Sequence, residues 1–108
     1  MFIQTEVSKD PDVVTFLPGR AVVEGEVIVF SDSVSAGRSP LASRLFDLEG
    51  VFEITLGHEF IRIRKTEDGD WQLMKPEILG AIMEHYTSGL PMILDGDDES
   101  EEFDEADS

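Results

Sequence analysis

Residues 51–65 read VFEITLGHEFIRIRK and decide the fold, because apolar and polar side chains alternate on both sides of a short turn. Successive side chains of a β-strand point to opposite faces, so this period of two is typical of strands with one buried face. The turn consists of Gly57, His58 and Glu59. The stretch predicts an antiparallel hairpin whose inward-facing residues are Phe52, Ile54, Leu56, Ile61 and Ile63.

Three basic residues lie close together in the second strand of this hairpin: Arg62, Arg64 and Lys65. They are a candidate positive patch for an acidic partner segment. The alternative is an exposed sheet face whose charges balance neighbouring carboxylates or discourage edge pairing. Phe16 and Leu17 are a second candidate for a docking surface, with the core as the alternative for both.

Three further strands are predicted upstream of the hairpin, at residues 2–7, 13–19 and 26–30. The first alternates Ile3, Thr5 and Val7 on one face and can pair with the second across the turn at Pro11. The third, EVIVF, is nearly continuously apolar, which suits a strand covered on both faces.

Two helices complete the pattern. Ser39 and Pro40 open the first, as N-cap and first helical residue, and Gly50 is expected just past its end. Asp70 is placed to cap the second, from about residue 71 to residue 87. Proline 76 should kink that helix or set apart its first turn. Gly80 lies inside the second helix, where a glycine suggests close packing against the sheet or the first helix. The apolar stripes are Leu41, Leu45 and Leu48, then Trp71, Met74, Ile78, Ile82 and Tyr86.

These elements follow the order β-β-β-α-β-β-α. They predict an α+β fold with a single antiparallel-rich sheet of about five strands and two helices packed on it. The chain of 108 residues has room for one domain at residues 1–94.

The charge is concentrated at one end. The chain carries −16, but nine of its 24 acidic residues lie in DGDDESEEFDEADS at residues 95–108, leaving −7 on the rest. Such acidity disfavours direct contact with nucleic acid or an anionic membrane. Segment 95–108 is predicted to be an acidic disordered linker or tail, because it cannot bury enough apolar surface to fold. It lacks the glycine of a calcium loop, so only weak attraction of divalent ions is expected.

No residue set predicts catalysis or metal binding. The chain has no cysteine, so it offers no thiol nucleophile and no thiolate ligand for zinc or iron. Its two histidines, His58 and His85, have no partner at metal-ligand spacing and are expected at the surface. We therefore predict a chain that is not an enzyme and holds no cofactor of its own.

Several separate blocks together resemble a known family. They are MFIQTE at 1–6, FLPG at 16–19, RSPLASRLF at 38–46, EGV at 49–51, G-x-x-F-I at 57–61 and W-x-x-x-K-P-E-I-L-x-A-I-M at 71–83. Residues 1–94 resemble the N-terminal domain of Nfu-type, NifU-like iron–sulfur cluster scaffold proteins. One departure is SKDPDV at 8–13, where only Pro11 matches the family's usual turn.

The resemblance implies a non-catalytic domain that recognises protein partners, either apo iron–sulfur clients or delivery proteins. In the family the cluster is carried by a separate C-terminal domain with a C-x-x-C motif, which is absent here; segment 95–108 would then lead to that domain. The alternative is a stand-alone acidic adaptor whose tail binds a basic partner or divalent ions. We expect a monomer in the bacterial cytoplasm, with the mitochondrial matrix after processing as the alternative location.

Overall fold

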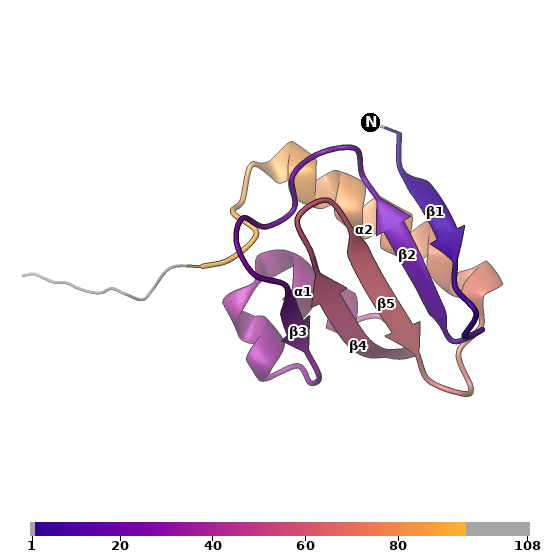
Figure 1. The fold of residues 1–108 in the computed structure, drawn as a ribbon. Helices are drawn as coiled ribbons and strands as arrows, with labels where there is room; N and C mark the ends of the chain where they lie inside the picture. Colours follow the sequence, from indigo (N-terminus) through magenta and orange to yellow (C-terminus); the bar gives the residue numbers. More distant parts are fainter. Residues whose placement is uncertain (1, 95–108) are drawn as a thin grey trace, which may run out of the picture.

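The computed structural model describes residues 2–94 of the chain. One antiparallel sheet has the strand order β1-β2-β5-β4-β3. Both main helices lie on the same side of this sheet, so its other side is not covered by a helix (Figure 1). The predicted α+β fold is confirmed. The strands are β1 (Gln4–Val7), β2 (Val13–Leu17), β3 (Ile28–Phe30), β4 (Val51–Leu56) and β5 (Ile61–Lys65).

The hairpin that decided the prediction is present, with one correction. β4 and β5 pair antiparallel, and Ile54 lies opposite Ile63. A β-bulge between Val51 and Glu53 shifts the register at the start of β4. An extra residue in one strand changes the face of the residues before it. Phe52, predicted to face inward, is therefore 57% exposed, and Val51 packs against the core instead.

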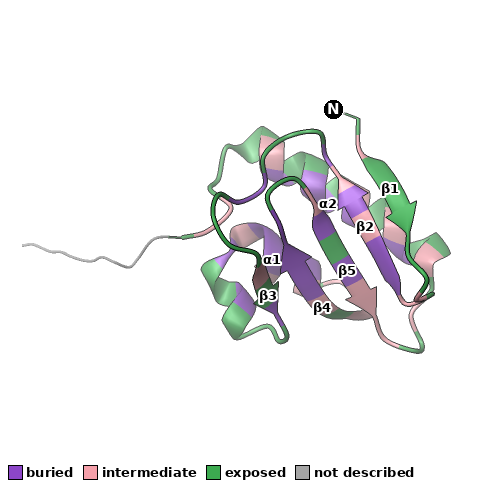
Figure 2. Cartoon of the chain, viewed as in Figure 1, coloured by how far each residue is buried: buried purple, intermediate pink, exposed green. Residues whose placement is uncertain are grey.

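The two edge strands are more exposed than predicted. β1 pairs with β2 as expected, but all four of its residues are exposed (Figure 2). β3 lies at the opposite edge, and Val29 is 52% exposed. The prediction that residues 26–30 are covered on both faces is wrong, because an edge strand has only one neighbour and no helix covers the outer face here.

The first helix, α1 (Pro40–Phe46), begins where the sequence predicts. The hydroxyl of Ser39 accepts a hydrogen bond from the Ala42 amide at 3.1 Å. The helix ends earlier than predicted, with Asp47 as C-cap, so Gly50 is not its C′ residue. Gly50 does adopt a left-handed backbone, with φ of 96°, in the turn before β4. A short 3-10 helix, η1 (Ser35–Arg38), precedes α1 and was not predicted.

The second helix, α2 (Trp71–Ser88), starts at the predicted cap and ends one residue later than predicted. The Asp70 carboxylate accepts from the Gln72 amide at 2.9 Å. Pro76 lies inside this helix, which continues through it as one element. The prediction for Gly80 is wrong: it is exposed, and a Cβ at this position would meet nothing within 4 Å.

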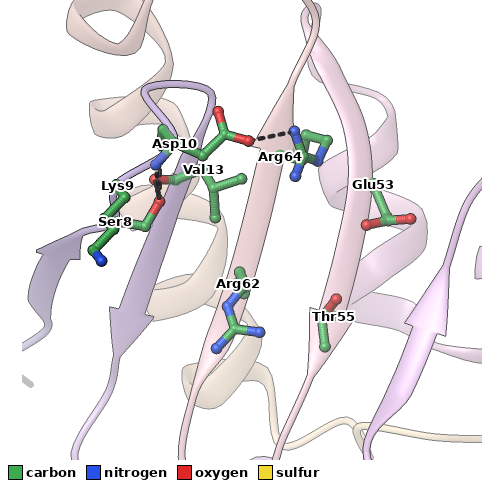
Figure 3. Close-up of a pocket in the computed structure, with 8 residues that line it drawn as sticks. All are labelled: Ser8, Lys9, Asp10, Val13, Glu53, Thr55, Arg62 and Arg64. Carbon is green, nitrogen blue, oxygen red and sulfur yellow. Dashed lines mark hydrogen bonds and ion pairs between the residues drawn. The ribbon is translucent and has the colours of Figure 1, made fainter.

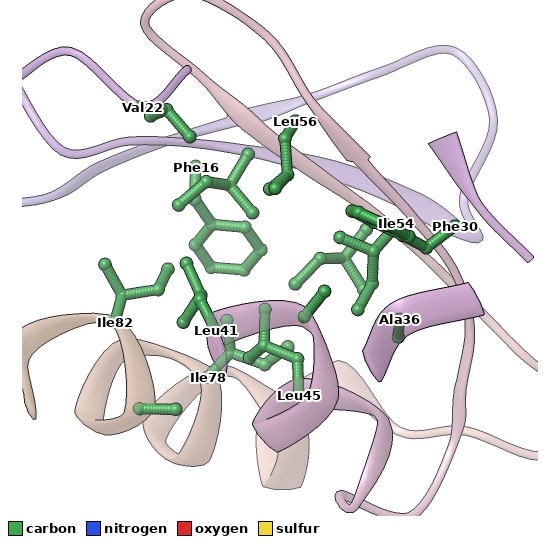
Figure 4. Packing of buried hydrophobic residues seen from close by; sticks show 14 of the residues in the cluster. Phe16, Val22, Phe30, Ala36, Leu41, Leu45, Ile54, Leu56, Ile78 and Ile82 are labelled. Carbon is green, nitrogen blue, oxygen red and sulfur yellow. The ribbon is translucent and has the colours of Figure 1, made fainter. Parts of the chain in front are cut away.

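The core lies between the sheet and the two helices (Figure 4). Phe16, Ile54 and Leu56 point from the sheet toward Leu41 and Leu45 of α1 and toward α2. Fully burying one such side chain contributes about 1.5–3 kcal/mol, so this layer is a main source of favourable burial energy. Its fully buried large side chains include Phe16, Phe30, Leu41, Leu45, Ile54, Leu56, Ile61, Ile63, Ile78 and Ile82.

The described chain ends in a segment that folds back on the domain. Gly89 closes α2 with a left-handed backbone, and the Leu94 amide donates to the Arg38 carbonyl at 2.7 Å. Met92 and Ile93 are partly buried against the core. This segment forms no strand and covers part of the core as a flap. The predicted linker or tail at 95–108 lies outside the described residues.

Candidate partner-binding face

The side of the sheet without helices carries the candidate site, and we name it the open face. Alternation along β2, β5 and β4 places every second side chain there. The register sets Thr15 opposite Arg62 and Arg62 opposite Thr55, so these three form a row across the sheet. The open face is defined by Glu53, Thr55, Val13, Thr15, Leu17, Arg62, Arg64 and the adjoining Phe60.

Arg62 occupies the middle of this face and is exposed. Its Nε donates to the Thr15 hydroxyl at 3.4 Å, and its guanidinium lies 4.8 Å from the centre of the Phe60 ring. Cations over aromatic rings are attracted by about 0.5–1 kcal/mol at exposed sites. No carboxylate lies within ion-pair distance of Arg62 in residues 2–94. The charge is thus oriented by neutral groups and available to an anion.

Arg64 is arranged differently, because the turn between β1 and β2 supplies it with a carboxylate. Asp10 pairs with Arg64 at 2.8 Å, as Figure 3 shows. The backbone amide of Asp12 and then the Arg64 guanidinium hold the pKa of Asp10 below its ordinary value. Trp71 fixes the same turn by donating from Nε1 to the Pro11 carbonyl at 2.8 Å. The turn at 8–13, which departs from the family pattern in sequence, therefore places Lys9 and Asp10 beside the open face.

A hollow of about 410 Å³ lies in this part of the open face. Lys9 and Asp10 reach it from the turn, Arg62 and Arg64 from β5, and Glu53 from β4 (Figure 3). Three bases and two acids therefore surround it. In a domain that is acidic as a whole, this spot has an excess of positive charge. Uncharged lining residues are Ser8, Val13 and Thr55.

An apolar part of the open face adjoins Arg62. Leu17 lies beyond Thr15 on the same side of β2 and is partly buried. The Phe60 ring packs on Gly57 so closely that a Cβ at position 57 would overlap it. This contact requires a glycine and holds Phe60 beside Arg62. The face therefore offers a fixed cation next to apolar surface.

The five predicted site residues do not stay together. Arg62, Arg64 and Leu17 share the open face, as described above. Phe16 is fully buried in the core on the other side of the sheet, so it is not available to a partner. The Lys65 ammonium pairs with Asp12 at 2.8 Å and its side chain is 11% exposed. The patch is thus narrower than predicted, because alternation turns Phe16 into the core and the ion pair with Asp12 takes Lys65 away. Lys9 and Phe60 join it only through tertiary contacts.

A second hollow, of about 710 Å³, lies beside the start of α2. Four acids and no base line it, namely Glu49, Asp68, Asp70 and Glu77. Its floor includes Met74, which packs between Gly50 and Gly69. The two hollows therefore have opposite charge, and negative charge at a helix N-terminus also stabilises the helix itself.

The histidines form no catalytic arrangement. His85 is 4% exposed, so the prediction of a surface position is wrong for it, whereas His58 is exposed as predicted. Burial lowers the pKa of His85, and the nearby Arg44 charge adds to this effect. Its ring lies edge-on to Tyr86, with centres 5.7 Å apart. Helical spacing had left this position at the edge of the apolar stripe, and the fold buries it.

Residues 2–94 contain no cluster of three or more histidine, cysteine or acidic side chains that could hold a metal ion. None of the helices in the same range is both long and apolar enough to cross a bilayer.

Comparison with known proteins places the chain in a family. It belongs to the family described as scaffold protein Nfu/NifU N terminal, whose model matches residues 3–89. The resemblance drawn from separate sequence blocks is confirmed.

Among its relatives is the human protein named NFU1 iron-sulfur cluster scaffold homolog, mitochondrial, which is 42% identical over 110 residues. That alignment covers 97% of this chain and 43% of the human protein. NifU-like protein 4, mitochondrial, of Arabidopsis thaliana is 39% identical over 95 residues, covering 88% of this chain and 34% of the relative. The chain thus spans less than half the length of these relatives.

Solved structures agree on the fold. A NifU-like protein from Saccharomyces cerevisiae superposes with a TM-score of 0.76 at 23% identity, covering 85% of this chain and 83% of the other. Protein SAV1430 from Staphylococcus aureus gives 0.67 at 18% identity, over 76% of this chain and 99% of the other. At these identities the likeness concerns the fold alone.

Proposed function

We propose that this chain is the non-catalytic recognition domain of an iron–sulfur cluster scaffold protein and that its open face binds the partner. The observation that carries the proposal is Arg62, a cation held by neutral neighbours next to Phe60 and Leu17 in a member of a scaffold family. The partner would be an apo iron–sulfur client or a delivery protein that presents a carboxylate beside an apolar side chain.

The cluster itself is cargo for this domain and does not fit its residues. Iron–sulfur clusters are held by cysteine thiolates in most proteins, and this chain has no cysteine. We propose that the cluster is carried on a C-terminal C-x-x-C domain, to which residues 95–108 lead as an acidic linker.

The proposal is tested by titrating the chain with apo iron–sulfur proteins prepared by removing their clusters with a chelator. The double variant Arg62→Glu with Arg64→Glu should weaken binding by about tenfold or more, which is about 1.4 kcal/mol. A matched control, Arg38→Glu with Lys75→Glu, makes the same change in net charge away from the open face and should alter affinity less than about twofold.

Three outcomes would overturn the proposal: no binding of any apo-protein, equal losses in both double variants, or binding that disappears only when residues 95–108 are removed. The last outcome would instead favour an acidic adaptor that binds through its tail. Sedimentation of the free chain tests the accompanying proposal that the domain is a monomer.

The location is part of the same proposal. The named relatives are mitochondrial proteins, which supports the mitochondrial matrix over the bacterial cytoplasm. Imaging of the tagged full-length protein in the source organism checks this directly.

A further inference from the structure

The open face also has a candidate occupant within the same polypeptide. We propose that the acidic segment at 95–108 docks in cis on the open face, with Phe103 against Phe60 and Leu17 and its neighbouring carboxylates against Arg62 and Lys9. This inference goes beyond the proposed function and does not depend on it.

The chemistry of the segment matches that of the face. Phe103 is the one large apolar residue between positions 95 and 108, and it stands within EEFDE at 101–105. An apolar residue among carboxylates is complementary to an apolar surface beside a cation. Arg62 supplies a cation without a carboxylate partner in residues 2–94, and the Phe60 ring lies next to it.

Charge also discriminates between the two hollows. The hollow on the open face has three bases and two acids, whereas the hollow beside α2 has four acids and no base. The acidic segment is repelled by the second and by the net charge of the domain as a whole. It is attracted only locally, over about one Debye length, which is about 10 Å at 0.1 M salt.

Because the segment is covalently attached to the domain, even a weak contact is enough for it to dock. Leu94 is held to Arg38, and Phe103 lies nine positions further along the chain, a length that can span about 30 Å when extended. A domain of this size has a radius of gyration of about 12 Å, so the segment is long enough to pass around the sheet edge. Short tethers give effective concentrations in the millimolar range, so docking requires only a modest intrinsic affinity.

The test compares amide spectra of the intact chain and two tail variants by ¹⁵N NMR at about 0.1 M salt. One variant alters the matching motif, with Phe103→Ala, Glu101→Gln, Glu102→Gln, Asp104→Asn and Glu105→Gln. The matched control removes the same charge near the anchor, with Asp95→Asn, Asp97→Asn, Asp98→Asn and Glu99→Gln. The motif variant should shift the amides of Thr15, Thr55, Phe60 and Arg62 at least about twice as much as the control does.

A reciprocal variant strengthens the test. Arg62→Glu should shift the Phe103 amide toward its position at about 0.5 M salt, where screening releases the segment. The inference is overturned if the motif variant leaves the open face unchanged or if the shifts gather near Arg38. It is also overturned if the shifts grow with protein concentration, because the segment then binds a second copy.

These outcomes are separate from those of the proposed function. Loss of client binding in the Arg62 and Arg64 variant, without any effect of the tail motif, would support the recognition face and reject docking in cis. Tail-dependent shifts without client binding would do the reverse. If both hold, the motif variant should bind clients more tightly than the intact chain, because a competitor has been removed.

Discussion

The two faces of the sheet differ in burial and in charge. β2 and β5 contribute Phe16, Ile61 and Ile63 to the covered face, where each is fully buried. The same strands contribute Arg62 and Arg64 to the open face, with Leu17 beside them. Neighbouring residues thus serve packing on one side and surface chemistry on the other, because a strand sends alternate side chains to opposite faces.

The largest expected effect is on the covered face. Phe16→Ala removes a fully buried ring and should lower the free energy of unfolding by about 3–5 kcal/mol, because a cavity remains in the core. Leu17→Ala is the control from the open face and should cost much less. Urea unfolding monitored by circular dichroism measures both. Equal losses would mean that the two faces do not differ as described.

A substitution at the turn of the hairpin comes next. Gly57→Ala places a methyl group where the Phe60 ring now packs, so we expect a loss of about 1–3 kcal/mol from overpacking. The shifted ring should also move the Arg62 Nε resonance. Gly80→Ala is the control: its methyl group meets nothing within 4 Å, and removing a glycine from an exposed helix should stabilise by about 0.5–1 kcal/mol.

A buried imidazole on the covered side predicts a pH dependence. Burial and the Arg44 charge lower the pKa of His85, so the folded chain holds it neutral while the unfolded chain takes up a proton near 6.5. The free energy of unfolding should therefore decrease as the pH falls below 6.5. Urea unfolding at about pH 7.5 and about pH 5.5 measures the decrease. His85→Gln should reduce this decrease, whereas His58→Gln, at an exposed position, should preserve it.

The smallest expected effect on stability is at the centre of the open face. Arg62→Glu should change the free energy of unfolding by no more than about 0.5 kcal/mol, because the side chain is exposed. Its effect should appear in binding instead. A large loss of stability in urea would show that Arg62 is part of the framework and would weaken any reading of the open face as a surface for partners.

The predictions that failed were those about exposure and packing, which depend on tertiary contacts. Alternation and helix caps located five strands and two helices, since both are local consequences of backbone geometry. Strand pairing produces the bulge that exposes Phe52, and it also places β3 at the sheet edge. No local sequence pattern shows how the strands pair. Gly80 and His85 failed for the same reason, because helix packing alone decides which side of α2 is covered.

The candidate site was predicted in part. The outward position of Arg62 and Arg64 followed from alternation along residues 60–65. Leu17 was among the predicted residues, but its place beside Arg62 required the pairing of β2 with β5. Lys9 and Phe60 entered the site only through a turn and a ring contact.

The sequence by itself determined the order of elements, the caps at Ser39 and Asp70, the family, and the absence of thiolate ligands for a cluster. Each of these depends on residue type and spacing along the chain. Tertiary structure alone decided which cations remain without a partner: Asp10 reaches Arg64 and Asp12 reaches Lys65 across more than fifty residues, while Arg62 is left to neutral groups. Ion pairs depend on distance in space, and residues so far apart in the sequence come close only when the chain folds.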